Sequence, residues 1–186
     1  MTDRSRIPVI VSAARTPIGR FLGGLGSLSA PELGAHAIRA ALARAKIDAS
    51  ALDEVIMGNV VQGGVGQAPA RQAAIKGGVP ATVPAFAVNK VCGSGLQAVM
   101  LAAQAIRAGD AQALVAGGME SMSTAPYYVN GIRTGVKFGQ QALVDGLIHD
   151  GLWCAFGQNH MGGYAEYTAK KAGITRARQD EFALAS

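Results

Sequence analysis

The sequence has little cysteine, few aromatic residues and little charge. It contains two cysteines in 186 residues, and aromatic and charged residues make up 5% and 16% of the chain. Two cysteines are too few for a disulfide framework, so we expect a reducing, cytoplasmic compartment. The formal net charge is +5, but the basic residues are scattered and the aromatics that would stack on bases are scarce. We therefore expect no nucleic-acid partner.

Long hydrophobic runs are also absent. No segment extends for 18 residues without a polar break, and the first thirty residues lack the apolar centre of a signal peptide. We expect a soluble protein with no membrane partner and no targeting segment.

Carboxylates are missing from one long internal stretch. None occurs between Glu54 and Asp110, whereas four basic residues lie there: Arg71, Lys76, Lys90 and Arg107. Such a stretch suits an anionic ligand or a thiolate. A solvated basic face would give the same pattern.

Predicted strands and helices alternate along the first two thirds of the chain. Short apolar runs predict strands at 7–11, 55–61, 83–88 and 111–116. A capping box of Ser29 and Glu32 begins a helix that extends to Ala45, and further helices are predicted at 70–76 and 95–108. The last of these is apolar on nearly every side, which predicts a helix buried between layers. The alternation indicates an α/β fold with right-handed crossovers and a mostly parallel sheet.

The hydrophobic pattern of the sequence changes after Gly118. Residues 119–160 show no clear period, and helices are predicted at 163–172 and after a cap at Thr175. We therefore divide the chain into a core at 1–122 and the beginning of an inserted loop domain at 123–186. The apolar face of the last helix is cut at Ser186, which predicts that the chain is part of something longer.

A glycine-rich turn at Gly64-Val65-Gly66 follows a strand and precedes a helix. Pro69 stands where a dinucleotide fingerprint needs its third glycine, and no acid follows at the distance required for the ribose. The turn does not indicate a dinucleotide cofactor.

Cys92 is the most informative residue. The segment Asn89-Lys90-Val91-Cys92-Gly93-Ser94-Gly95 joins a predicted strand to the apolar helix and places the cysteine at the helix N-terminus. Free N–H groups and the helix dipole favour an anion there and make a thiol a better nucleophile. The glycines leave room for an acyl group. A small buried cysteine in a strand-to-helix turn would give the same pattern.

An acid or base partner for Cys92 is harder to identify. His36 and His149 suit surface or packing roles, whereas His160, at a helix entry, suits either a ligand contact or a helix-entry hydrogen bond. Cys154, beside Trp153 and Phe156, is predicted to be an inert core residue.

The chain resembles the N-terminal half of a thiolase. The matching segments follow in order along nearly the whole chain: 12–19, 58–60, 66–74, 89–95, 117–123, 150–152, 160–162 and 179–183. The resemblance implies a thiolase-type βαβ half-core with a buried helix. It implies an acetyl-CoA C-acetyltransferase of fatty acid metabolism, which condenses acetyl-CoA or thiolyses 3-ketoacyl-CoA through an acyl thioester.

The same resemblance implies roles for individual residues. Cys92 is the implied nucleophile, and its backbone N–H contributes to the oxyanion hole. His160, Met161, Leu152 and Gln67 are implied to line the acyl and pantetheine pocket. CoA thioesters are substrates, so no cofactor and no metal is implied. The family's second cysteine and the histidine of its Gly-His-Pro motif belong to its other half, and this sequence contains neither motif, so the chain alone is expected to be inactive.

The segment 124–151 is implied to join dimers into a homotetramer. Residues matching its pattern are Arg133, Gly135, Lys137, Gly139 and Asp145. Ala68 and the pair Trp153-Cys154 depart from the family pattern and leave the acyl-chain length open. Two alternatives remain from the sequence: a condensing enzyme like the ketoacyl synthases, and a non-catalytic half-core that dimerises.

Overall fold

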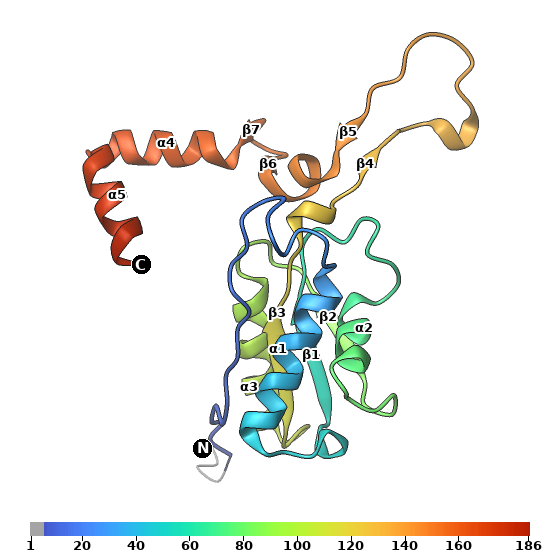
Figure 1. The fold of residues 1–186 in the computed structure, drawn as a ribbon, viewed down its shortest axis with the longest axis vertical. Coiled ribbons are helices and arrows are strands. Elements are labelled where there is room, and N and C mark those ends of the chain that lie inside the picture. The colour runs from blue at the N-terminus through green and yellow to red at the C-terminus, as the bar shows by residue number, and fades with distance from the viewer. Residues whose placement is uncertain (1–5) are drawn as a thin grey trace.

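A computed structural model describes residues 6–186, so residues 1–5 of the predicted core lie outside the described residues. Its centre is a parallel sheet of three strands, β1 (Glu54–Gly58), β2 (Ala85–Val88) and β3 (Leu114–Gly118), in the order β2-β1-β3 (Figure 1). The register places Val55 opposite both Ala85 and Val115. The α/β class with a parallel sheet, expected for a thiolase N-terminal half-core, is confirmed.

Helices cover both faces of the sheet. Helices α1 (Ala30–Ala45) and α2 (Pro69–Lys76) pack together on one face, and α3 (Ser94–Ala108) lies on the other (Figure 1). The alternation along β1 explains this arrangement. Val55 and Met57 belong to the core beneath α1 and α2, whereas Ile56 packs with residues of α3. Both faces of a parallel strand are buried in this way, which accounts for its continuous apolar run.

The ends of α1 and α2 follow from local sequence. The predicted capping box is present: the Glu32 carboxylate accepts from the Ser29 backbone N–H at 2.8 Å, and the Ser29 side chain accepts from the Glu32 backbone. The Ser29 hydroxyl also donates to the Glu32 carboxylate at 2.6 Å. Helix α2 begins at Pro69. A backbone N–H at this first position would have no acceptor within the helix, so the N–H that proline lacks costs no helical hydrogen bond. Gly77 and Gly78 follow its last residue and end it.

Two expectations about the core are wrong. Residues 7–11 form no strand, and Ile7, Val9 and Ile10 are largely exposed. Apolar periodicity alone does not make a strand, because strand hydrogen bonds need a neighbouring strand, and in residues 6–186 no strand pairs with this segment. The chain is bound to the core on either side of this segment, by hydrogen bonds from Arg6 Nη1 to the Ala108 carbonyl at 3.2 Å and from Arg44 Nη1 to the Ala13 carbonyl at 2.7 Å.

The second correction concerns α3, which was expected to be buried on all sides. Ala98 and Ala102 are buried against the sheet, but Leu96 is 67% exposed and Met100 is 47% exposed. The described residues contain one sheet layer for α3 to pack on. Its outer apolar face therefore meets solvent.

Beyond β3 the chain leaves the sheet. Strands β4 (Tyr127–Tyr128) and β5 (Val144–Asp145) pair antiparallel, and the loop between them projects from the molecule (Figure 1). A short π-helix at Ile148–Leu152 leads into the hairpin of β6 (Trp153–Cys154) and β7 (Asn159–His160).

Two further helices complete the chain, α4 (Met161–Lys171) and α5 (Arg176–Ala185), and both lie away from the sheet (Figure 1). They match the two predicted terminal helices, and the Thr175 hydroxyl accepts from the Arg178 N–H as an N-cap does. None of the helices in residues 6–186 is long and apolar enough to cross a membrane. The boundary at 122/123 stays a prediction.

Candidate functional site

The turn between β2 and α3 carries Cys92. Gly93 forms the N-cap of α3, so Cys92 lies at the start of that helix, as the sequence predicted. The thiol is exposed, unlike the small buried cysteine that the sequence left open as an alternative, and the preceding strand β2 lies at one side of the three-stranded sheet. Within residues 6–186, no helix or strand covers this turn, so the cysteine is open to solvent.

Hydrogen bonds within the chain define this turn. Ser94 is 4% exposed, and its hydroxyl donates to the Val91 carbonyl at 2.6 Å and accepts from the Lys90 N–H at 2.8 Å. The Val91 N–H donates to Asn89 Oδ1 at 2.9 Å, and the Gly93 N–H donates to the Lys90 carbonyl at 3.0 Å. The residues on both sides of Cys92 are therefore fixed in place.

Glycines let the start of α3 approach the sheet. A Cβ on Gly58, the last residue of β1, would lie 2.5 Å from the Gly95 nitrogen and 2.7 Å from Ser94 Cβ. A Cβ on Gly118 would lie 3.2 Å from Gly95 Cα. The close approach therefore depends on Gly58 and Gly118, whereas a Cβ on Gly95 itself would lie no closer than 3.6 Å to a neighbouring atom, the Gly118 nitrogen. The room that Gly95 is expected to leave for an acyl group stays a prediction. A Cβ on Gly93 would meet only Lys90, at 3.4 Å and beyond.

The basic residues of the carboxylate-free stretch do not converge on Cys92. Both terminal nitrogens of Arg71 donate to backbone carbonyls, of Val83 at 3.2 Å and of Ala81 at 2.7 Å. Lys90 Nζ donates to Gln97 Oε1 on α3 at 2.9 Å. Lys90 is thus the one member of the stretch that the structure places in the turn itself, and Arg71 has a structural role.

The loops that follow the three strands all begin at the same edge of the sheet, the edge formed by the carboxyl ends of the strands, because the strands are parallel. Gln67 lies in the exposed loop after β1, Cys92 in the turn after β2, and Glu120 directly after β3. This edge is where α/β sheets generally bind ligands. Topology thus gathers Gln67 and Cys92 at one end of the core.

The other implied pocket residues lie in the hairpin region. His160 is the N-cap of α4, where its Nδ1 accepts from the Gly162 N–H at 2.9 Å. This is the helix-entry hydrogen bond that the sequence left open as an alternative. Met161 is the first residue of α4 and is 40% exposed, and Leu152 ends the π-helix. Within residues 6–186, no hydrogen bond joins His160 to Cys92.

A carboxylate that the sequence analysis did not single out connects the loops after β1 and β3. Glu120 accepts from Asn59 Nδ2 at 2.8 Å and from the backbone N–H groups of Val60 and Val61 at 2.9 and 3.2 Å. Burial raises the pKa of Glu120 above its ordinary value, against the opposing effect of these donors. Asn59 is 1% exposed and also donates to the Met119 carbonyl at 3.2 Å. No periodicity or spacing marks this pair, because its members are far apart in sequence.

A second polar cluster holds the strand β4 to the π-helix. The Tyr128 hydroxyl donates to Asp150 Oδ2 at 2.6 Å, and His149 Nδ1 lies 2.7 Å from Asp150 Oδ1. The hydrogen bond to the carboxylate raises the pKa of Tyr128 and lowers that of Asp150. His149 thus contacts a neighbouring side chain at the surface, as expected.

Cys154 differs from the inert core residue that was predicted. It is half-buried on β6, and its sulfur accepts from the Gly157 N–H at 3.3 Å. Hydrogen bonds from the Gly157 and Phe156 N–H groups and from the Tyr164 hydroxyl lower the pKa of Cys154. The hairpin turn supplies the two backbone donors and α4 supplies Tyr164, and the sequence did not indicate them.

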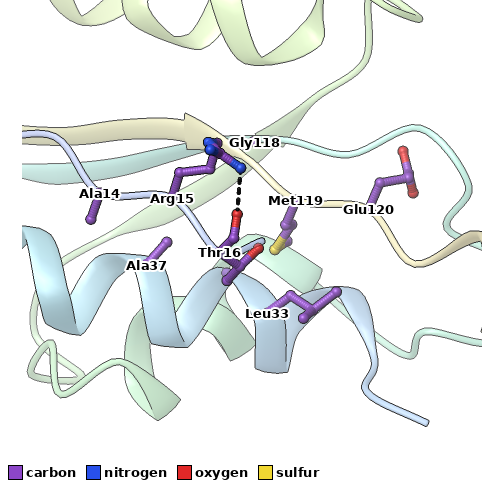
Figure 2. A pocket seen from close by; sticks show the side chains of 9 residues that line it. Ala14, Arg15, Thr16, Leu33, Ala37, Gly118, Met119 and Glu120 are labelled. Carbon is purple, nitrogen blue, oxygen red and sulfur yellow. Dashed lines mark hydrogen bonds between the residues drawn. The ribbon is translucent and has the colours of Figure 1, made fainter. Parts of the chain in front are cut away.

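Two pockets lie beside the first helix, and Cys92 lines neither. One of about 180 Å³ is bounded by the segment 14–16, by α1 and by the end of β3. In it, Arg15 Nη1 donates to the Thr16 carbonyl at 3.0 Å, and Glu120 lies at the far end (Figure 2). The other, of about 300 Å³, lies under the loop 16–26 and against 120–123. Within residues 6–186, no three His, Cys, Asp or Glu residues are grouped so that they could hold a metal ion.

Comparison with known proteins gives a consistent result. Residues 8–186 match the family model described as the N-terminal domain of thiolase. An acetyl-CoA acetyltransferase of Cupriavidus necator is 60% identical over 178 residues, and one of Escherichia coli is 59% identical over 179 residues. Each alignment covers 96% of this chain and 45% of the relative. The chain thus spans about half the length of the curated relatives it matches.

Proposed function

This chain belongs to the thiolase family, and from that premise we propose that it supplies the nucleophile of an acetyl-CoA C-acetyltransferase. The observation that carries the proposal is Cys92 at the start of α3, exposed to an incoming substrate and held between residues that are fixed by hydrogen bonds. The names of the relatives support the substrate class, a CoA thioester. The complete activity is proposed for a longer protein that contains this chain.

In the proposed reaction, the Cys92 sulfur attacks the carbonyl carbon of an acyl-CoA. A bond forms between that sulfur and the acyl carbon, the bond from the carbon to the CoA sulfur breaks, and the thiol proton passes to the CoA thiolate. A base then removes a proton from the α-carbon of a second acetyl-CoA, and that carbon attacks the acyl carbon. The bond from the acyl carbon to the Cys92 sulfur breaks, and the released Cys92 thiolate takes the proton back from the base. Thiolysis of 3-ketoacyl-CoA is the reverse sequence.

The geometry of the turn supports an oxyanion role for the backbone of Cys92. The N–H groups of Lys90, Val91, Gly93 and Ser94 all donate within the turn. Among the hydrogen bonds of residues 6–186, none engages the N–H of Cys92. It is therefore available to the carbonyl oxygen of an acyl group on the same residue, where donors stabilise the developing negative charge. A second donor, and the base, would come from outside this chain.

We place the acyl and pantetheine groups beside Gln67, Leu152, His160 and Met161. Gln67 shares the ligand-binding edge of the sheet with Cys92, and the other three follow one another around the β6–β7 hairpin. No cofactor takes part, because the CoA thioesters are substrates. A reducing compartment such as the cytoplasm would keep the Cys92 thiol reduced.

We also propose that the longer protein is a homodimer or a homotetramer. The loop between β4 and β5 projects from the molecule, and its Phe138 is 99% exposed (Figure 1). The same loop exposes Ile132, Val136 and Leu143, and several exposed apolar side chains on one projecting loop suit contact with another subunit. Sedimentation of the longer protein with and without Phe138→Ser tests this role.

The experiment that tests the function is a thiolysis assay with acetoacetyl-CoA and CoA. The longer protein should turn over, and Cys92→Ser should lose activity by several orders of magnitude. Cys154→Ser is the matched control and should leave turnover in place. Full activity of Cys92→Ser would refute the assignment of the nucleophile.

The 186-residue chain alone should show no turnover. A positioned base typically contributes about 10²–10⁴-fold, and one oxyanion donor about 10²–10³-fold. Both contributions are assigned to the remainder of the protein. Measurable turnover by the purified chain would mean that its own residues supply them, with His160 the first to test by substitution.

A further inference from the structure

The residue directly before Cys92 has an unusual backbone conformation. Val91 has a φ of 47°, which lies in the left-handed region. For a β-branched side chain this region is strained, because Cβ crowds the backbone. Such a conformation persists only where the surrounding structure imposes it.

Both backbone polar groups of Val91 are bound by neighbouring side chains. Its N–H donates to Asn89 Oδ1 at 2.9 Å. Its carbonyl accepts from the Ser94 hydroxyl at 2.6 Å and from the Ser94 N–H at 3.0 Å. The same hydroxyl accepts from the Lys90 N–H at 2.8 Å, so the Ser94 oxygen binds the backbone of both Lys90 and Val91.

Ser94 is itself held firmly. It is 4% exposed, and its backbone lies against Gly58 at the end of β1. The hydroxyl is therefore fixed relative to the sheet, and through it the position of the Val91 carbonyl is fixed as well. Asn89 is exposed and provides the second, weaker restraint.

We propose that Ser94 is a positioning residue that locks Val91 in its left-handed conformation and so directs Cys92 at the N-terminus of α3. Without the hydroxyl, rotation about the backbone of Val91 relieves the strain and displaces Cys92, which follows it in the chain. The catalytic consequence rests on the proposed function. The conformational lock does not.

Backbone chemical shifts of residues 91 and 92 in this chain test the lock directly, because they report φ. Ser94→Ala should move these shifts away from left-handed values. The double variant Ser94→Ala with Val91→Gly should keep left-handed values, each taken as the deviation from the random-coil shift of the residue type present, because glycine adopts a positive φ without strain. Ser121→Ala is the matched control. Ser121 is also buried, and its hydroxyl donates to the Leu28 carbonyl at 2.7 Å, so the shifts at 91 and 92 should stay unchanged.

Kinetics of the longer protein test the consequence. Ser94→Ala should lower kcat on the order of 100-fold, the scale of a misplaced reacting group, with a much smaller change in KM. Adding Val91→Gly should restore at least about 10-fold of that kcat. A serine that only stabilised the fold would not be rescued by a glycine at position 91.

Should Ser94→Ala fail to fold, Ser94→Cys offers the same test, because it keeps a side chain of similar size and replaces the hydroxyl by a thiol that makes weaker hydrogen bonds. Unchanged shifts at residues 91 and 92 in Ser94→Ala, or in Ser94→Cys if that variant is used, overturn the lock. Moved shifts in a protein that has no thiolase activity even as wild type uphold the lock and refute the proposed function instead.

Discussion

The contact between Gly58 and the start of α3 allows a quantitative prediction. A Cβ on Gly58 would lie 2.5 Å from both the Gly95 nitrogen and the Ser94 carbonyl carbon, and 2.7 Å from Ser94 Cβ. Two of these are backbone atoms, which cannot rotate away, so Gly58→Ala must push α3 off the sheet. Overpacking a core commonly costs about 1–3 kcal/mol. We expect a value near the top of this range.

The measurement is thermal unfolding followed by circular dichroism. For a chain of this size, 1 kcal/mol corresponds to a Tm shift of about 2–4 °C. Gly58→Ala should therefore lower Tm by roughly 6–12 °C for a loss of about 3 kcal/mol. Because the displaced segment includes the turn before Ser94, the rate at which iodoacetamide alkylates Cys92 should change as well.

Gly117→Ala is a matched control in the neighbouring strand. A Cβ there would lie 3.7 Å from Met57 Sδ and 3.9 Å from its Cε, both ordinary contact distances. Its cost should be small, within about 1 kcal/mol, since alanine also reduces the entropy of the unfolded chain. If Gly58→Ala melted as Gly117→Ala does, the close approach of α3 to β1 would be refuted.

Three further predictions concern titratable groups. Limited alkylation near neutral pH should label Cys92 before Cys154, because Cys92 is exposed and Cys154 is half-buried; the lowered pKa of Cys154 favours its own labelling, so the order depends on access outweighing thiolate fraction, and peptide mapping that found Cys154 labelled first would contradict this. Burial raises the pKa of Glu120, so the folded chain binds a proton at this carboxylate more tightly than the unfolded chain does. The resulting stabilisation of the fold is fully present below about pH 4.5 and is lost as the pH rises through the raised pKa. Glu120→Gln should remove this part of the fall in Tm above pH 4.5. If Tm fell with pH at the same slope in both proteins, the assignment to Glu120 would be wrong. Asp150→Asn should bring the raised pKa of Tyr128 back towards 10.0, as followed by ultraviolet titration, with Tyr128→Phe identifying the signal; no movement of that titration would exclude the hydrogen bond between them.

The local features were predictable from sequence because they depend on neighbours in the chain. The capping box at Ser29, the helix start at Pro69 and the strand-turn-helix segment around Cys92 involve residues a few positions apart. The Glu120 contacts with the loop after β1 were not predictable. They join residues about sixty positions apart, and nothing in either segment indicates its partner.

By itself, the sequence determined the α/β class, most helix and strand positions, the family, and Cys92 as the residue at a helix start. These depend on periodicity, capping and motif residues, which are properties of short segments. Tertiary structure alone decided that residues 7–11 pair with no strand in the described chain, that one face of α3 and Cys92 are exposed, and that Ser94 holds Val91 at a positive φ. Strand pairing, burial and strain each require a second surface, and which surfaces meet is settled only when the chain folds.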